Sequence, residues 1–171
     1  KAGIKQEDGT FKKHNTGVYF QPIPKDPNTN LSEIDYKEAE ELGYFKLDFL
    51  NVHVYDNVKS EQHLIELMNK EPSWELLEHE EFVSKLFHIS NYGSLLRKLK
   101  PKSIEDLAAV LAIIRPAKRY LENSTWDIIR KEVWIKDNKG SYAFKKSHSI
   151  AYAVLIAVHM NLIIEDLTAN T

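Results

Sequence analysis

The apolar run at residues 150–164 constrains this chain more than any other feature. Its sequence is IAYAVLIAVHMNLII, in which His159 and Asn161 are the strongly polar side chains. The run is too short to span a bilayer comfortably, and two polar residues would be costly in lipid. We therefore expect a buried helix in the core of a globular fold, with no membrane as a partner.

The rest of the chain predicts an α+β fold, a small β-containing N-terminal part followed by a mainly helical region. Glycines and prolines near the start indicate turns around a short strand at residues 18–21. Polar and apolar residues alternate in GYFKLDFL (43–50), which predicts a half-buried strand with Asp48 on its polar side. Beyond it the apolar spacing is helical, so we place two parts at 1–50 and 51–171.

Capping residues indicate where two of the helices begin. Ser103 is followed by an aspartate three residues later, which predicts a helix running to Ile114. Ser124 or Thr125 is expected to cap another helix over 126–134.

Charge is distributed unevenly, although the net charge is only −2. Residues 31–81 carry 14 acidic and 4 basic side chains, whereas residues 82–146 carry 14 basic and 6 acidic ones. The basic segment is either a set of solvated helix faces or a surface that binds phosphates. The chain has no cysteine, which excludes disulfides and thiolate metal sites and fits a reducing, intracellular setting.

The stretch FKKSHS (144–149) places two lysines where the last helix begins. Lysines at a helix N-terminus oppose the macrodipole, unless an anion binds there to the free backbone N–H groups. Lys146 would supply charge to such an anion, and Ser147 and His148 could donate hydrogen bonds to it. The alternative is an ordinary serine cap with incidental lysines.

Two further places carry candidate chemistry. In WDIIRKEVW (126–134), Arg130 and Lys131 are expected to project outward together, either on a plain basic surface or on a phosphate. Asp48 is either an edge residue or a ligand for a hard cation such as Mg²⁺. One carboxylate does not make a two-metal site. The sequence contains no HExxH, phosphate-loop or nucleophile-elbow motif.

Five segments, in this order, resemble the C-family replicative DNA polymerases, the bacterial DNA polymerase III alpha subunits. They are ELGYFKLDFL (41–50), LFHISNYGSLLRKLKP (86–101), SIEDLAAVLAIIRPA (103–117), WDIIRKEVW (126–134) and FKKSHSIAYAVL (144–155). HNTGVYF (14–20) is similar to a further segment upstream. The resemblance implies that residues 1–50 end a palm-like subdomain and that residues 51–171 form fingers.

The resemblance also implies roles for particular residues. Asp48 would be a catalytic palm carboxylate at a shared Mg²⁺ site. The residues expected around the triphosphate of an incoming dNTP are Arg115, Arg130, Lys131, Lys146, Ser147 and His148. Those expected to contact DNA are Arg97, Lys98 and Lys100. The implied partners are primer–template DNA, a dNTP and a segment or chain carrying the rest of the palm, in the cytoplasm of a bacterial or virus-infected cell.

The chain also departs from the family pattern. The paired Asp-x-Asp of the palm is missing, as are the phosphoesterase domain, the thumb and two long insertions. Ala117 stands for a glycine and Lys145 for an asparagine. We therefore expect a shortened, phage-like polymerase piece that is inactive without carboxylates from elsewhere. The alternative is a non-catalytic, degenerate fragment that binds DNA, a nucleotide or a replisome protein.

Overall fold

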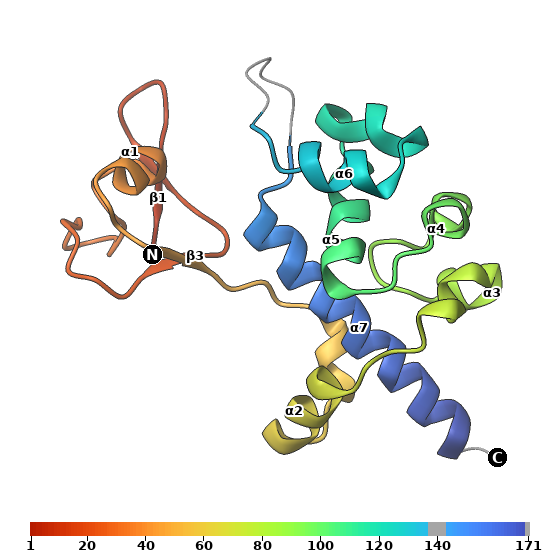
Figure 1. The fold of residues 1–171 in the computed structure, drawn as a ribbon. Coiled ribbons are helices and arrows are strands. Elements are labelled where there is room, and N and C mark those ends of the chain that lie inside the picture. The colour runs from red at the N-terminus through yellow and green to blue at the C-terminus, as the bar shows by residue number, and fades with distance from the viewer. Residues whose placement is uncertain (137–142, 170–171) are drawn as a thin grey trace. The chain divides into compact units, whose positions relative to one another are not determined.

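The computed structural model describes residues 1–136 and 143–169, and the chain divides into two compact units (Figure 1). The first unit is Lys1–Val52 and the second is His53–Thr171. The first contains short antiparallel strands and the second is helical, so the predicted α+β fold is confirmed. The assignment of the units to palm and fingers stays a prediction.

The first unit consists of two small antiparallel ribbons and one short helix. Strand β1 (Gly3–Lys5) pairs with β2 (Phe11–Lys13) around a turn in which Gly9 has a φ of 83°. Strand β3 (Gly17–Tyr19) pairs with β4 (Lys46–Asp48), so that Gly17 lies opposite Asp48. Between these two strands runs α1 (Tyr36–Glu41).

Strand β4 corrects the sequence prediction in its length and in its exposed side. The alternating stretch 43–50 forms a strand over three residues only, and the strand predicted at 18–21 begins one residue earlier. The apolar side is the exposed one, because Phe45 and Phe49 are 67% and 58% exposed. The Asp48 side chain is 24% exposed, since hydrogen-bonding neighbours surround it. The alternation of residues correctly divided the strand into an apolar and a polar side. It did not show that the polar side is the one that contacts other side chains.

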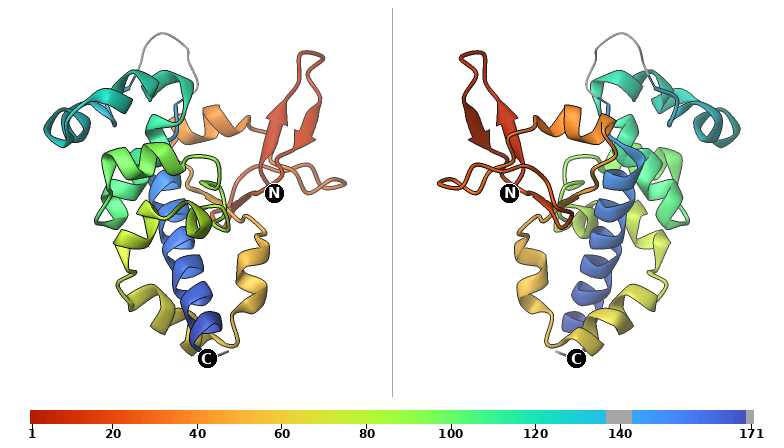
Figure 2. Two further views of the ribbon diagram at one scale, coloured as in Figure 1. Left: turned by 90° about the vertical axis from the view of Figure 1, so that its right-hand side faces the viewer. Right: turned by 90° about the vertical axis from the view of Figure 1, so that its left-hand side faces the viewer.

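The second unit is a set of helices packed around the last one. Its elements are the 3₁₀-helices η1 (His53–Asn57), η2 (Trp74–Glu78) and η3 (Pro116–Asn123), and the α-helices α2 (Glu61–Asn69), α3 (Glu80–Val83), α4 (Gly93–Leu99), α5 (Ile104–Ile113), α6 (Trp126–Glu132) and α7 (Lys146–Ala169). Helix α7 runs through this unit, with α5 beside its first half and α2 beside its second half (Figures 1 and 2).

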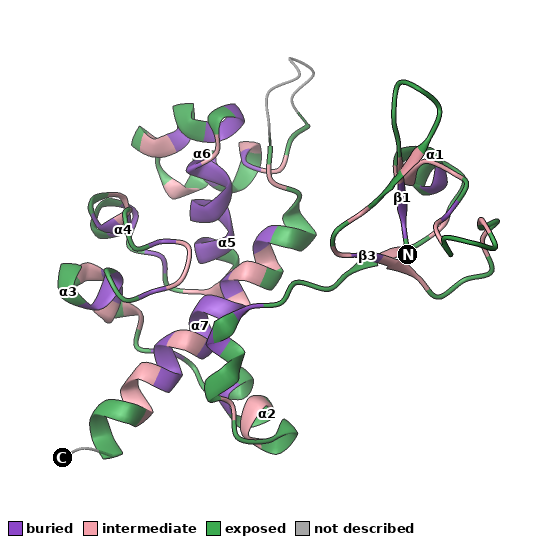
Figure 3. Ribbon diagram, turned by 180° about the vertical axis from the view of Figure 1, so that it is seen from behind, coloured by how far each residue is buried: buried purple, intermediate pink, exposed green. Residues whose placement is uncertain are grey.

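Helices α5 and α7 form the core of the second unit. Every residue of α5 from Asp106 to Ile113 is buried (Figure 3). Helix α7 buries Ala153, Ile156 and Met160, which recur every three or four residues and therefore share one face. The Ser103 hydroxyl accepts a hydrogen bond from the Asp106 N–H at 3.0 Å, which confirms the predicted cap of α5. Thr125 is the N-cap residue of α6, without a side-chain cap hydrogen bond.

Helix α7 extends beyond both ends of the apolar run at 150–164. By length and composition alone, the whole helix could cross a membrane, and the expected absence of a membrane partner stays a prediction. Its most apolar window is 44% buried inside the protein, and the buried residues include Ala153, Ile156 and Met160 of the core. The buried Asn161 amide donates to the carbonyl oxygens of Leu67 at 3.0 Å and Lys70 at 2.9 Å. These bonds cap the end of α2 and tie it to α7.

Candidate functional site

The first turn of α7 presents three of the predicted residues to solvent. Lys146, Ser147 and His148 are exposed. The hydrogen bond from the Ser149 N–H to the Lys145 carbonyl at 2.9 Å marks the beginning of the helix. N–H groups in a first turn have no partner within the helix, and they lie at the positive end of its dipole. Ser149 is fully buried, which prevents its hydroxyl from reaching an external anion.

Arg115 is brought to this helix start from the end of α5. Its Cζ lies 4.7 Å from the centroid of the Phe144 ring, just before α7. The His148 ring meets the same phenyl ring edge-on, with centroids 6.3 Å apart. Phe144 thus joins two of the predicted nucleotide-binding residues, which are distant in the sequence.

A cluster of aromatic rings that includes His88 and Tyr152 also contacts Arg115. The Arg115 Nη2 donates to His88 Nε2 at 2.7 Å. The imidazole of His88 stacks on Tyr152 of α7, with centroids 4.8 Å apart and planes 15° apart. Burial and the nearby Arg115 charge lower the pKa of His88 below its ordinary value, so the ring is uncharged at pH 7.

Sequence reasoning missed the roles of His88, Phe144 and Tyr152. All three lie inside segments that carry the polymerase resemblance, and that was the available signal. None of them belongs to a spacing pattern, because their contacts join three distant parts of the chain.

Arg130 and Lys131 lie on α6 in different surroundings. Arg130 Nη2 lies 3.1 Å from Asp106 Oδ1, and its Cζ lies 5.3 Å from the Trp126 ring centroid. Since Asp106 is in the first turn of α5, this ion pair fastens α6 to α5. Lys131 is exposed. Of the two, Lys131 is thus the one whose replacement leaves this helix contact intact.

The start of α7 also lies near the chain that follows α6. Lys146 Nζ is 5.9 Å from the ring centroid of Trp134. The end of α6 is held by Lys118, whose buried Nζ donates to the carbonyl oxygens of Glu132 at 2.9 Å and Ile135 at 2.8 Å. A lysine that binds carbonyl groups at a helix C-terminus also interacts favourably with the dipole.

The three predicted DNA-binding residues are engaged by neighbouring side chains. Arg97 pairs with Glu80 at 2.5 Å, and Lys100 pairs with Glu78 at 2.7 Å. Lys98 donates to the Asn123 side-chain oxygen. Part of the basic charge after residue 81 is therefore offset by the acidic segment before it.

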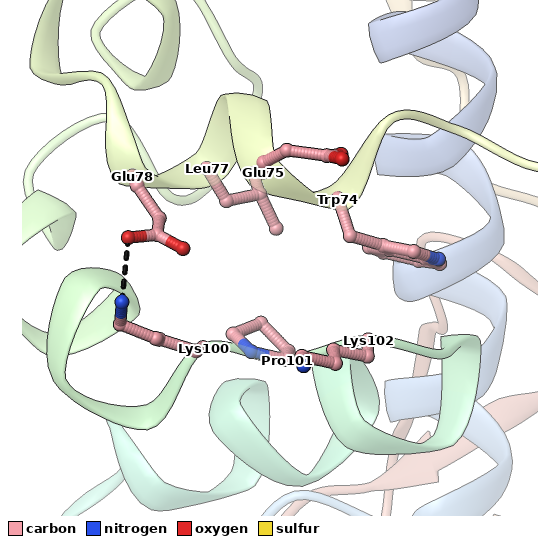
Figure 4. Close-up of a pocket in the computed structure, with 7 residues that line it drawn as sticks. All are labelled: Trp74, Glu75, Leu77, Glu78, Lys100, Pro101 and Lys102. Carbon is pink, nitrogen blue, oxygen red and sulfur yellow. Dashed lines mark hydrogen bonds and ion pairs between the residues drawn. The ribbon is translucent and has the colours of Figure 1, made fainter.

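Lys100 also lines a cavity of about 350 Å³ in the second unit (Figure 4). Trp74 and Leu77 lie on one side of it and Pro101 and Lys102 on the other, with the Lys100–Glu78 ion pair across one end. Two acidic and two basic residues line the cavity, so it carries no excess of positive charge for phosphates.

Asp48 lies in a polar cluster of the first unit. Its Oδ1 accepts hydrogen bonds from Thr16 Oγ1 at 2.9 Å and Lys46 Nζ at 2.5 Å, and His14 Nδ1 is 4.0 Å away. Burial by itself would raise the pKa of Asp48, but the bonds from Lys46 and Thr16 outweigh it and hold that pKa below its usual value. The carboxylate is therefore charged at neutral pH.

The described residues do not by themselves fit a divalent metal ion. Across 1–136 and 143–169, no group of three or more His, Asp or Glu side chains could hold one. At Asp48 the nearest cation is the Lys46 ammonium, which contacts both carboxylate oxygens. Mg²⁺ would need further carboxylates and a displaced lysine.

The chain is similar to the DNA polymerase III subunit alpha of Aquifex aeolicus (strain VF5). The two are 31% identical over an alignment of 125 residues, and the match covers 60% of this chain. The chain spans only 11% of the length of that relative. No protein-family model matches the chain, and no solved structure matches it. The similarity supports a distant relationship to a DNA polymerase.

Proposed function

We propose that this chain supplies the dNTP-binding fingers and one palm carboxylate of a C-family-like DNA-directed DNA polymerase. A further segment or chain would carry the remaining palm carboxylates and Mg²⁺ ligands. In this assembly the partners are primer–template DNA and a dNTP, and the setting is the cytoplasm of a bacterial or virus-infected cell.

The gathering of Arg115, His148 and Lys146 around the start of α7 carries this proposal. Arg115 and His148 share Phe144, and Lys146 lies on the same exposed helix turn. A triphosphate at this position would meet a guanidinium, an ammonium and the positive end of the helix dipole. The relationship to a polymerase subunit supports a nucleoside triphosphate as the anion.

Fewer contacts support the roles proposed for the other candidate residues. Lys131 and Ser147 are exposed and could contact the phosphates, whereas Arg130 also holds Asp106. Contact between DNA and Arg97, Lys98 or Lys100 would compete with their present partners.

A second function is favoured by the surroundings of Asp48. Because its carboxylate contacts the Lys46 ammonium and no metal-binding group is present in the described ranges, the chain alone suits binding better than catalysis. The second candidate is thus a non-catalytic module that binds a nucleotide, DNA or a replisome protein.

Binding of a dNTP to the full chain, measured by calorimetry in the presence of EDTA, tests the shared part of both functions. We expect the Lys146→Ala/His148→Ala double variant to bind more weakly than the unmodified chain. Lys70→Ala/His79→Ala is a matched control, because it removes the same two residue types from exposed positions. Lys70 is far from the proposed site. Its carbonyl contacts Asn161, which lies about 22 Å along α7 from Lys146. Equal affinity of the two double variants would refute the site.

Primer extension distinguishes the two functions. It requires an assembly with a segment that carries an Asp-x-Asp palm motif. In the first function Asp48→Asn abolishes extension, whereas Thr16→Val, which removes a hydrogen bond to the same carboxylate, retains part of it. Unchanged extension by Asp48→Asn would remove Asp48 from the catalytic site.

A further inference from the structure

His88 has an unusual backbone conformation beside the proposed triphosphate site. Its φ is 69°, in the left-handed region that residues with a side chain rarely adopt. The Ile89 N–H donates to the Phe87 carbonyl at 2.9 Å, which closes a three-residue turn around His88. Such strained residues persist where the surrounding structure holds them, and they cluster at functional sites.

At this turn the His88 ring contacts two aromatic rings and the Arg115 guanidinium. The ring stacks on Tyr152 at 4.8 Å and lies nearly parallel to Phe144 at 6.4 Å. Its Nε2 accepts the hydrogen bond from Arg115 Nη2 at 2.7 Å. Guanidinium groups have fixed donor directions, so one bond at Nη2 and the Phe144 ring below Cζ together restrict the whole plane.

The chemistry of this acceptor matters as much as its position. A guanidinium only donates hydrogen bonds, so the Nε2 that accepts from it carries no proton, and this contact orients the guanidinium without neutralising it. An ion pair such as Arg130–Asp106 instead offsets part of the cationic charge. An anion-binding site benefits from the hydrogen bond to the imidazole, because that bond leaves the charge of the guanidinium for the anion.

We propose that His88 is a positioning residue, which holds Arg115 as a phosphate-binding group through the hydrogen bond that its Nε2 accepts. The phosphate part of this inference rests on the proposed function. A role in packing alone would require the ring and not the nitrogen. The two roles can therefore be separated by substitution.

Two variants of the full chain separate the ring from the acceptor. His88→Phe keeps an aromatic ring and lacks the acceptor, and His88→Gln keeps an acceptor and lacks the ring. We expect His88→Phe to bind a dNTP about tenfold more weakly, the affinity equivalent of one hydrogen bond to a charged group. His88→Gln should recover most of that loss. Circular dichroism and thermal unfolding establish that both variants are folded.

Wild-type affinity in a folded His88→Phe variant would overturn the proposal, as would equal losses in the two variants. If one variant fails to fold, the dNTP affinity of the other is compared with that of the unmodified chain, and this comparison tests the proposal. Weak binding by His88→Gln would then count against the proposal, and strong binding by His88→Phe would do so equally.

An NMR titration of His88 tests the contact without any ligand. The titratable and charged groups in contact with its ring are Arg115 from the end of α5 and Tyr152 from α7. Replacing Arg115 with glutamine removes a like charge, so the pKa of His88 should rise toward its ordinary value. An unchanged His88 pKa would overturn the contact. If the unmodified chain binds no dNTP although the His88 pKa responds, the proposed function fails and the role in phosphate binding fails with it.

Discussion

Replacing Asn161 with leucine should detach the end of α2 from α7. The Asn161 amide donates to two carbonyl oxygens at the end of α2, those of Leu67 and Lys70. Leucine has a similar volume and no donor, so the change removes both hydrogen bonds with little change in packing. In the variant the two carbonyl groups must find other partners or remain unpaired.

The two carbonyl groups contribute unequal amounts. The bond to Leu67 is buried, so losing its donor costs about 1–3 kcal/mol for an unsatisfied group. The bond to Lys70 is partly buried, and water can replace it, which leaves a cost of about 0.5–1.5 kcal/mol. We expect the free energy of unfolding to fall by about 1.5–4.5 kcal/mol, the sum of the two contributions.

Urea unfolding followed by far-ultraviolet circular dichroism measures this change by linear extrapolation. Hydrogen exchange should locate the effect, because the amides of α2 would lose more protection than those of α5. Asn91→Leu is a control at an exposed asparagine and should change the free energy of unfolding by less than about 0.5 kcal/mol. A comparably small loss in Asn161→Leu would refute the view that this side chain holds α2 in place.

Three further substitutions test other parts of the structure. The Ser149 hydroxyl is buried without a hydrogen-bond partner among the described residues. In Ser149→Ala the free energy of unfolding measured in urea should therefore stay unchanged or rise by up to about 1 kcal/mol. A clear fall would contradict this. Lys46→Met should raise the pKa of Asp48 in a carboxyl NMR titration, and an unchanged value would count against the bond from Lys46. Because the folded-state pKa of Asp48 is lowered, its stabilising effect is present above the unfolded pKa and is lost as pH falls through the folded pKa; this loss should shrink in Lys46→Met. A methyl group at Gly17 would lie 2.7 Å from Lys46 Cδ and 3.0 Å from His14 Nδ1, so Gly17→Ala should destabilise the first unit by about 1–3 kcal/mol in chemical unfolding, and unaltered stability would show that both neighbours can shift freely.

Local patterns in the sequence determined several features of this protein. The apolar run at 150–164 indicated the core helix, because a nonpolar segment of that length must be buried wherever it packs. Ser103 indicated the start of α5, because a cap hydrogen bond joins residues three positions apart. The exposed start of α7 followed in the same way from the polar residues that precede the run.

Which charges and rings meet depends on the packing of segments that are far apart in the sequence. The contact between Arg115 and His88 joins residues 27 positions apart, and Arg130 finds Asp106 across 24 positions. At β4 the alternating pattern predicted the apolar side to be buried, yet the polar side is the one with partners. Periodicity reports the face of an element on which a residue lies. What lies opposite that face depends on how distant segments pack, and short-range sequence patterns carry no information about it.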